Sequence, residues 1–193
     1  KYWYLTFLYD FIYKCIDMNK VHFNSVDTDS LYMSIAGNMN APLDQLFDYV
    51  IKDKAFYDKH IYSFMPNPAI NTTYDTKKIL GCCIEKFGAN QVALCAKCYT
   101  IWSDDRTISL KLKGVSLKKN NIKSSDYKEV IDKQTILKGK NINLQLNNNK
   151  MSKITVIKNA LTSFHNKMLV LSNQCCCPYI HGMNASNYFI ENH

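Results

Sequence analysis

The segment from residue 21 to residue 35 constrains the fold most, because two extended stretches flank a short acidic turn. The first stretch is Val21–Val26, and the turn has the sequence Asp27-Thr28-Asp29-Ser30. In the second stretch, apolar side chains recur at every second position, as a half-buried strand requires: Leu31, Met33 and Ile35. The pattern predicts a β-hairpin with an acidic tip.

A helix is predicted immediately before this hairpin. Apolar residues recur there at helical spacing: Leu5, Leu8, Ile12, Cys15 and Ile16. Aromatic residues cover the other sides of the same helix: Phe7, Phe11 and Tyr13. A helix that is apolar on most of its surface is expected to pack beneath the sheet.

Further along the chain, strands dominate the prediction. Residues 38–78 form a connection with one short helix from Pro42 to about Ile51. Strands are predicted at Ile79–Lys86, Gln91–Trp102 and Thr107–Val115, with a turn at Gly88-Ala89-Asn90. A short helix capped by Ser124 or Ser125 follows, and then strands at 143–146 and 151–157 around a turn at 147–149. These elements predict an α+β fold with antiparallel sheets.

The net positive charge of the chain lies entirely in its second half. Residues 1–103 carry ten lysines and ten acidic residues, whereas residues 104–193 carry fourteen Lys or Arg and six acidic residues. The asymmetry predicts two regions, 1–103 and 104–193, of which the second faces a polyanion. A solvated charged face would give the same count.

Composition narrows the class of protein. No run of about eighteen apolar residues is free of charge, so we expect no membrane-spanning helix. Three of the eight cysteines are consecutive, which suits reduced thiols in an intracellular protein better than a secreted disulfide framework. Because the chain begins at Lys1 and has no secretory signal, we expect it to be an internal fragment of a longer protein.

The acidic turn suggests metal chemistry. Asp27 and Asp29 are two residues apart, so in extended backbone both carboxylates would project toward one side. Carboxylate oxygens suit Mg²⁺, which keeps waters and shares the phosphate oxygens of a substrate. A plain turn is the alternative, since Asp, Thr and Ser bond their own backbone.

The turn resembles the Tyr-x-Asp-Thr-Asp-Ser motif of family B DNA polymerases, which lies on a hairpin of the palm domain and follows a helix. The resemblance implies that Asp29 is the direct ligand of a two-metal Mg²⁺ site and that Asp27 is the accessory carboxylate. Thr28 and Ser30 complete the motif, whereas Ser25 stands where the family usually has an aromatic residue. A third carboxylate would come from another strand.

Two later segments resemble the same group, in its protein-primed branch. Ala96-Lys97-Cys98-Tyr99 is similar to a Lys-x-Tyr element that contacts the primer and template, which implies such contacts for Lys97 and Tyr99. The segment from Lys111 to Asn120 resembles a lysine-glycine element in polymerases of Polinton/Maverick-like mobile elements and related viruses. Its candidate DNA contacts are Lys111, Lys113, Gly114, Lys118 and Lys119.

Together these resemblances imply the C-terminal palm (1–103) and a basic thumb-like region (104–193) of a DNA-directed DNA polymerase. Such an enzyme adds deoxynucleotides to a primer 3′ end by two-metal phosphoryl transfer. The implied partners are primer-template DNA, deoxynucleoside triphosphates and a terminal protein as an alternative primer; the implied place is the nucleus or a viral replication site. Without the upstream motifs, the chain alone is expected to be inactive.

Two other interpretations remain open. A non-catalytic basic module that binds nucleic acid, such as a decayed mobile-element relic, would share the charge pattern. The other is an unrelated α+β domain whose acidic turn is accidental, which a structure without a hairpin at residues 21–35 would favour.

Two sets of cysteines are candidates for a zinc site. Cys95 and Cys98 have zinc spacing, but on a single strand their thiols would point to opposite faces, and no second pair has conventional spacing. A second candidate set is Cys175, Cys176, Cys177, His181 and His193. In both places incidental thiols are the preferred interpretation.

Overall fold

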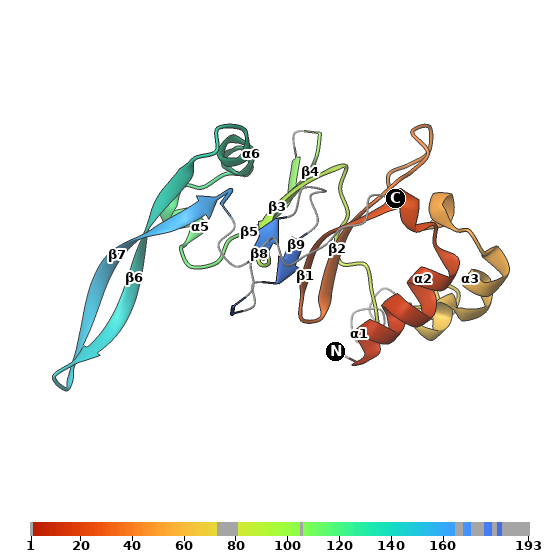
Figure 1. Cartoon of the computed structure of the whole chain (residues 1–193), viewed down its shortest axis with the longest axis horizontal. Coiled ribbons are helices and arrows are strands. Elements are labelled where there is room, and N and C mark those ends of the chain that lie inside the picture. The colour runs from red at the N-terminus through yellow and green to blue at the C-terminus, as the bar shows by residue number, and fades with distance from the viewer. Residues whose placement is uncertain are drawn as a thin grey trace. The chain divides into compact units, whose positions relative to one another are not determined.

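The computed structural model describes residues 2–72, 81–104, 106–164, 168–170, 176–178 and 181–182. The chain has mixed α and β structure with antiparallel sheets, as predicted (Figure 1). It divides into two compact units, Lys1–Lys111 and Leu112–His193. The boundary predicted from charge, after residue 103, falls between β4 (Cys98–Ser103) and β5 (Arg106–Lys111), which pair with each other.

A helical segment opens the first unit and supplies much of its core. α1 (Tyr2–Thr6), the π-helical η1 (Phe7–Ile12) and α2 (Tyr13–Cys15) follow one another without a break. Its buried side chains are Phe7, Leu8, Phe11, Ile12 and Cys15. Leu5, predicted on the buried face, is instead 47% exposed. The wider π-helical turn shifts the phase of the apolar face toward Phe7 and Phe11.

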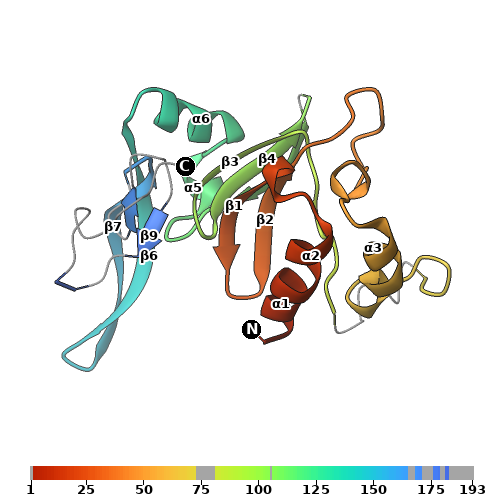
Figure 2. The same ribbon diagram turned by 45° about the vertical axis from the view of Figure 1, so that its right-hand side comes forward.

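The predicted hairpin is present. After the short η2 (Met18–Lys20), β1 (Val21–Asp27) pairs antiparallel with β2 (Ser30–Ile35). One face packs against the helical core through partly buried apolar side chains: Val21, Phe23, Leu31, Met33 and Ile35. Both views place the hairpin between the α1–α2 helix and the sheet that contains β3 (Asn90–Cys95) and β4 (Figures 1 and 2).

A β-bulge in β1 decides which residues share a face of the hairpin. The register shifts between Phe23 and Ser25, so that Asn24 is the extra residue. Before the bulge, Phe23 pairs with Met33 on the core side; after it, Ser25 pairs with Tyr32. After the bulge, the odd-numbered residues of β1 therefore point away from the core instead of toward it, and Asp27 lies on the face opposite the core.

The strands of the second sheet in this unit differ from the predicted ones. Gln91–Trp102 was predicted as one strand, but it folds back at Ala96-Lys97 into β3 and β4, and β5 completes the order β3-β4-β5. The fold-back was missed because neither turn residue is Gly, Asn or Asp, although Lys97 has a positive φ of 64°. Of the strand predicted at 79–86, residues 79–80 lie outside the described part, and 81–86 contain no strand.

The connection after β2 also differs from its prediction. No helix covers Pro42–Ile51; that stretch contains turns and η3 (Asp48–Val50). The helix begins later, as α3 (Lys54–His60), and continues into η4 (Ile61–Ser63). Asp53 sets the start, because its carboxylate accepts a hydrogen bond from the backbone N–H of Phe56 at 2.9 Å.

The second unit combines two short helices with a long hairpin. α5 (Leu117–Asn120) precedes α6 (Ser124–Asp132), and β6 (Ile136–Asn147) pairs with β7 (Lys150–Thr162) around a turn at Asn148-Asn149. The predicted strands are therefore present and longer, and the predicted turn at 147–149 is shorter, because Asn147 ends β6. β8 (Met168–Val170) and β9 (Cys176–Pro178) form a further antiparallel pair.

Side-chain contacts join these helices to the hairpin. The Asn120 amide donates to the Lys140 carbonyl at 3.0 Å and accepts from the Lys140 N–H at 2.7 Å. Lys123, rather than Ser124 or Ser125, holds the N-cap position of α6, and its backbone N–H donates to the Asp126 carboxylate at 2.8 Å.

Within the described residues, no helix combines the length and the apolar character needed to cross a membrane.

The aromatic core around Phe11 should dominate the stability of the first unit. Phe11 is fully buried, and its ring lies 5.4 Å from that of Phe64 and 5.5 Å from that of Tyr57. We expect Phe11→Ala to lower the free energy of unfolding by about 3–5 kcal/mol, because it leaves a cavity. Tyr9→Ala, at a side chain that is 62% exposed, should cost about 1 kcal/mol or less. Chemical denaturation measures both, and equal losses would contradict this assignment of the core.

Candidate functional site

The acidic tip of the β1–β2 hairpin is a tight turn. Asp27 is the last residue of β1, Thr28 has a φ of 56°, and Ser30 begins β2. The Asp29 N–H donates to the Asp27 carbonyl at 2.6 Å, and the Ser30 hydroxyl donates to the same carbonyl at 3.2 Å. The geometry predicted for Asp27 and Asp29 is therefore wrong, because the backbone at Thr28 and Asp29 forms a turn and is not extended. Asp29 lies in the turn and is exposed.

The turn that carries Lys97 meets this acidic tip. The Lys97 Nζ lies 3.3 Å from the Asp27 Oδ2. The Asp27 side chain is only 23% exposed, whereas that of Lys97 is 61% exposed. The ion pair therefore neutralises the more sheltered carboxylate and leaves Asp29 open to solvent.

A second contact lies beside the ion pair. The Tyr32 hydroxyl donates to the Tyr99 hydroxyl at 2.6 Å, and the two ring centroids are 4.4 Å apart. Burial raises the pKa of the Tyr32 phenol above its ordinary value, and the hydrogen bond to Tyr99 raises it further. Tyr99 itself is 3% exposed. Lys97 was predicted to share a strand face with Tyr99, but it lies in the turn before the strand.

Three polar residues that the sequence did not single out extend the same interface. The Asn24 amide donates to the Gln91 side-chain oxygen and to the Ser34 hydroxyl, the latter at 2.8 Å. Asn24 is the bulged residue of β1, so its side chain is positioned by the irregularity that also turns Asp27 over. The signal for it in the sequence is the pair of polar residues Asn24-Ser25 between Phe23 and Val26, which breaks the alternation of apolar and polar positions.

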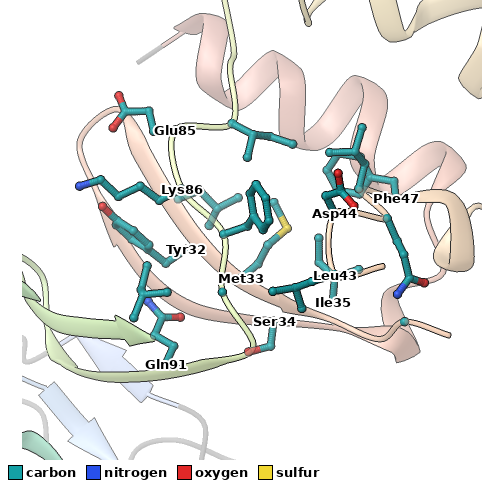
Figure 3. A pocket seen from close by; sticks show the side chains of 18 of the residues that line it. Tyr32, Met33, Ser34, Ile35, Leu43, Asp44, Phe47, Glu85, Lys86 and Gln91 are labelled. Carbon is teal, nitrogen blue, oxygen red and sulfur yellow. The ribbon is translucent and has the colours of Figure 1, made fainter. Parts of the chain in front are cut away.

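A cavity of about 860 Å³ lies along β2 (Figure 3). All of residues 29–37 line it, and the segment 81–91 forms another wall. Its lining mixes apolar side chains such as Met33 and Phe47 with charged ones: Asp29, Asp44, Glu85 and Lys86. Asp29 therefore borders both the solvent and a space large enough for a small molecule or a peptide segment.

The predicted lysine-glycine element is exposed but divided between the units. Lys111 ends β5 in the first unit, whereas the others belong to the second: Lys113, Gly114, Lys118 and Lys119. Gly114 has a φ of 97°, a conformation that favours glycine. Lys118 and Lys119 lie on α5, beyond the buried Val115.

The donors fit a Mg²⁺ site in part. Carboxylate oxygens are the ligands that Mg²⁺ prefers, and the chain offers those of Asp27 and Asp29. Among the residues that the structure describes, no group of three or more His, Cys, Asp or Glu side chains is arranged to hold a metal ion. Cys175 and His193 of the second cysteine set lie outside the described part.

The orientation predicted for Cys95 and Cys98 is wrong. Because the strand folds back between them, the two are cross-strand partners at the end of the β3–β4 hairpin. Partners in an antiparallel pair point to the same face of the sheet, not to opposite faces.

Comparison of the chain with protein-family models, curated proteins and solved structures finds no match. The function of the chain must therefore be inferred from its own residues, above all from those that join the Asp27 and Lys97 turns.

The Tyr32 phenol should make stability sensitive to alkaline pH. Its pKa is raised in the folded state, so its contribution is complete below the pKa of the unfolded chain and is lost as pH rises through the folded-state value. We expect the free energy of unfolding to fall as pH rises above about 10, the pKa of a tyrosine in the unfolded chain, and to fall less steeply in Tyr32→Phe. Tyr2→Phe, at a side chain that is 82% exposed, is the control. Identical pH profiles for Tyr32→Phe and the unaltered protein would refute this assignment.

Proposed function

We propose that this chain is the C-terminal palm and thumb part of a family B DNA polymerase. The proposal is carried by one observation: Asp-Thr-Asp-Ser and Lys-x-Tyr, the two segments that resemble polymerase motifs, contact each other. Tyr32 and Tyr99 are 67 positions apart in sequence and share a hydrogen bond, and Lys97 pairs with Asp27 beside them. An accidental acidic turn would not be expected to meet the second segment.

In this proposal the two carboxylates have different roles. Asp29 is exposed at the tip and is available to bind a cation directly. Asp27 is sheltered and already balanced by Lys97, which suits an accessory carboxylate that adjusts the charge of the site. Mg²⁺ ions, when bound, would stabilise the attacking and leaving oxygens of the phosphoryl group. A further carboxylate would come from a segment of the parent enzyme outside this chain.

Lys97 and Tyr99 also have different roles in this proposal. Lys97 is exposed at the end of a turn, so its ammonium group can reach a primer phosphate beside Asp29. Tyr99 is almost fully buried and its hydroxyl accepts from Tyr32, which leaves little surface for stacking on a base. We therefore assign Tyr99 the task of positioning the Lys97 turn.

The second unit supplies charge for the duplex. The β6–β7 hairpin contains five lysines and no acidic residue, and all five are exposed: Lys138, Lys140, Lys150, Lys153 and Lys158. Phosphate contacts of this kind fix the position of a protein on DNA without selecting a sequence. The same hairpin also favours the second candidate function, a non-catalytic nucleic-acid-binding module.

Primer extension by the parent enzyme, with its upstream segment restored, tests the proposal. Asp29→Asn should reduce Mg²⁺-dependent extension by about a thousandfold, because a lost metal ligand removes several kcal/mol of transition-state stabilisation. DNA binding, measured by fluorescence anisotropy, should be unchanged. Asp58→Asn is the matched control, since Asp58 is also exposed and pairs with Lys54 along α3.

The outcomes separate the candidates. Salt-dependent DNA binding, with no extension by either the parent enzyme or its variants, would favour the non-catalytic module. Full extension by Asp29→Asn would overturn the metal role of the tip. Robust extension by this chain alone would show that no upstream carboxylate is required.

A further inference from the structure

The turn that carries Lys97 is bounded by two cysteines, which face each other across the β3–β4 hairpin. Cys95 and Cys98 are register partners at its last pair, and both are thiols. Antiparallel partners have Cα atoms about 4.5 to 5.5 Å apart, and disulfides span about 4.4 to 6.8 Å. The pairing thus gives the two cysteines a Cα separation that a disulfide can span.

The two thiols differ in exposure, which suggests an order of reaction. Cys95 is exposed, whereas Cys98 is 5% exposed. A dissolved oxidant can therefore reach Cys95 first, and Cys98 is placed to resolve the product from the same hairpin. An exposed cysteine beside a resolving cysteine is the usual arrangement of a redox-sensing pair.

We propose that Cys95 and Cys98 are a reversible redox modification site, in which a disulfide clamps the turn that presents Lys97 to Asp27. The Cys95 thiolate attacks a sulfur of glutathione disulfide and releases one glutathione thiolate. The Cys98 thiolate then attacks the Cys95 sulfur and releases the second. Two cysteine thiols are oxidised, one glutathione disulfide is reduced to two thiols, and the two cysteine protons pass to the glutathione thiolates.

The disulfide would act on the turn rather than on the strands. Only Ala96 and Lys97 lie between the cysteines, and Lys97 has a φ of 64°, which lysine rarely adopts. A crosslink across this pair restricts the turn to conformations near the observed one. The ion pair between Lys97 and Asp27 forms with both cysteines as thiols, so oxidation would restrict the turn to the conformation that makes this pair, and reduction would remove that restriction.

Peptide mapping tests the crosslink directly. The chain is equilibrated with reduced and oxidised glutathione, its remaining thiols are alkylated, and it is digested with trypsin. Cleavage after Lys97 separates the cysteines, so the disulfide appears as peptide 87–97 linked to peptide 98–106. We expect this pair to form in oxidised glutathione and to disappear with dithiothreitol. Cys95→Ser, at an exposed position, should abolish it, whereas Cys83→Ser, at another exposed cysteine, should leave it intact.

Hydrogen–deuterium exchange tests the clamp. A peptic peptide that covers residues 95–98 should exchange more slowly after oxidation in the unaltered chain, and at the same rate in Cys95→Ser. Failure of the linked peptides to form, or preferential linkage of Cys95 to another cysteine, would overturn the proposed site. Formation without slower exchange would overturn the clamp. Neither measurement uses polymerase activity, so this inference and the proposed function can fail separately.

Discussion

The extra residue in β1 is the constraint on which the candidate site depends. Without the bulge at Asn24, strict alternation would place Ser25 and Asp27 on the same side as Phe23, against the apolar core. A carboxylate there would lose its hydration without a partner, which is costly. With the bulge, the hairpin has one apolar face and one polar face. The apolar face packs on the helix, and the polar face carries Asp27 and Tyr32 to the β3–β4 hairpin.

The features predicted correctly from sequence are those with strong local signals. Apolar spacing identified the first helix and the β1–β2 hairpin, and the Asn-rich turn identified the β6–β7 hairpin, whose Asn148 and Asn149 both have positive φ. The errors arise where local signals are weak. Ala96-Lys97 has no turn chemistry, so one strand was predicted in place of two. From that error followed the wrong orientation of Cys95 and Cys98 and the wrong location of Lys97. The contacts between hairpins, such as that of Tyr32 with Tyr99, depend on tertiary packing and produce no periodic pattern in the sequence.

The two carboxylates at the tip have unequal electrostatic environments. Asp27 has a cation 3.3 Å away and little exposure, whereas Asp29 is exposed and lines the cavity beside β2. A cation that approaches the tip therefore meets one open carboxylate and one already neutralised, so the net attraction is weaker than two free charges would give. Lys97 is thereby an internal competitor for any cation at Asp27, and a change in the position of its turn would change the affinity of the tip. The behaviour of the β3–β4 turn and the chemistry of the acidic tip are in this way coupled through one ion pair.

Two of the residues with a strained backbone lie at the same place. Several non-glycine residues have positive φ, and the asparagines among them tolerate it well. Thr28, which is β-branched, and Lys97 tolerate it less well, at a cost of about 1–2 kcal/mol each. These two residues occupy the tips of the two hairpins that meet at Asp27. Leu46 and Gln134 share the conformation elsewhere, so strain alone does not mark a site. What distinguishes Thr28 and Lys97 is that relaxing either turn would separate the Asp27 carboxylate from the Lys97 ammonium group. The surrounding contacts, chiefly the hydrogen bond of Tyr32 to Tyr99 and that of Asn24 to Gln91, hold both turns in place.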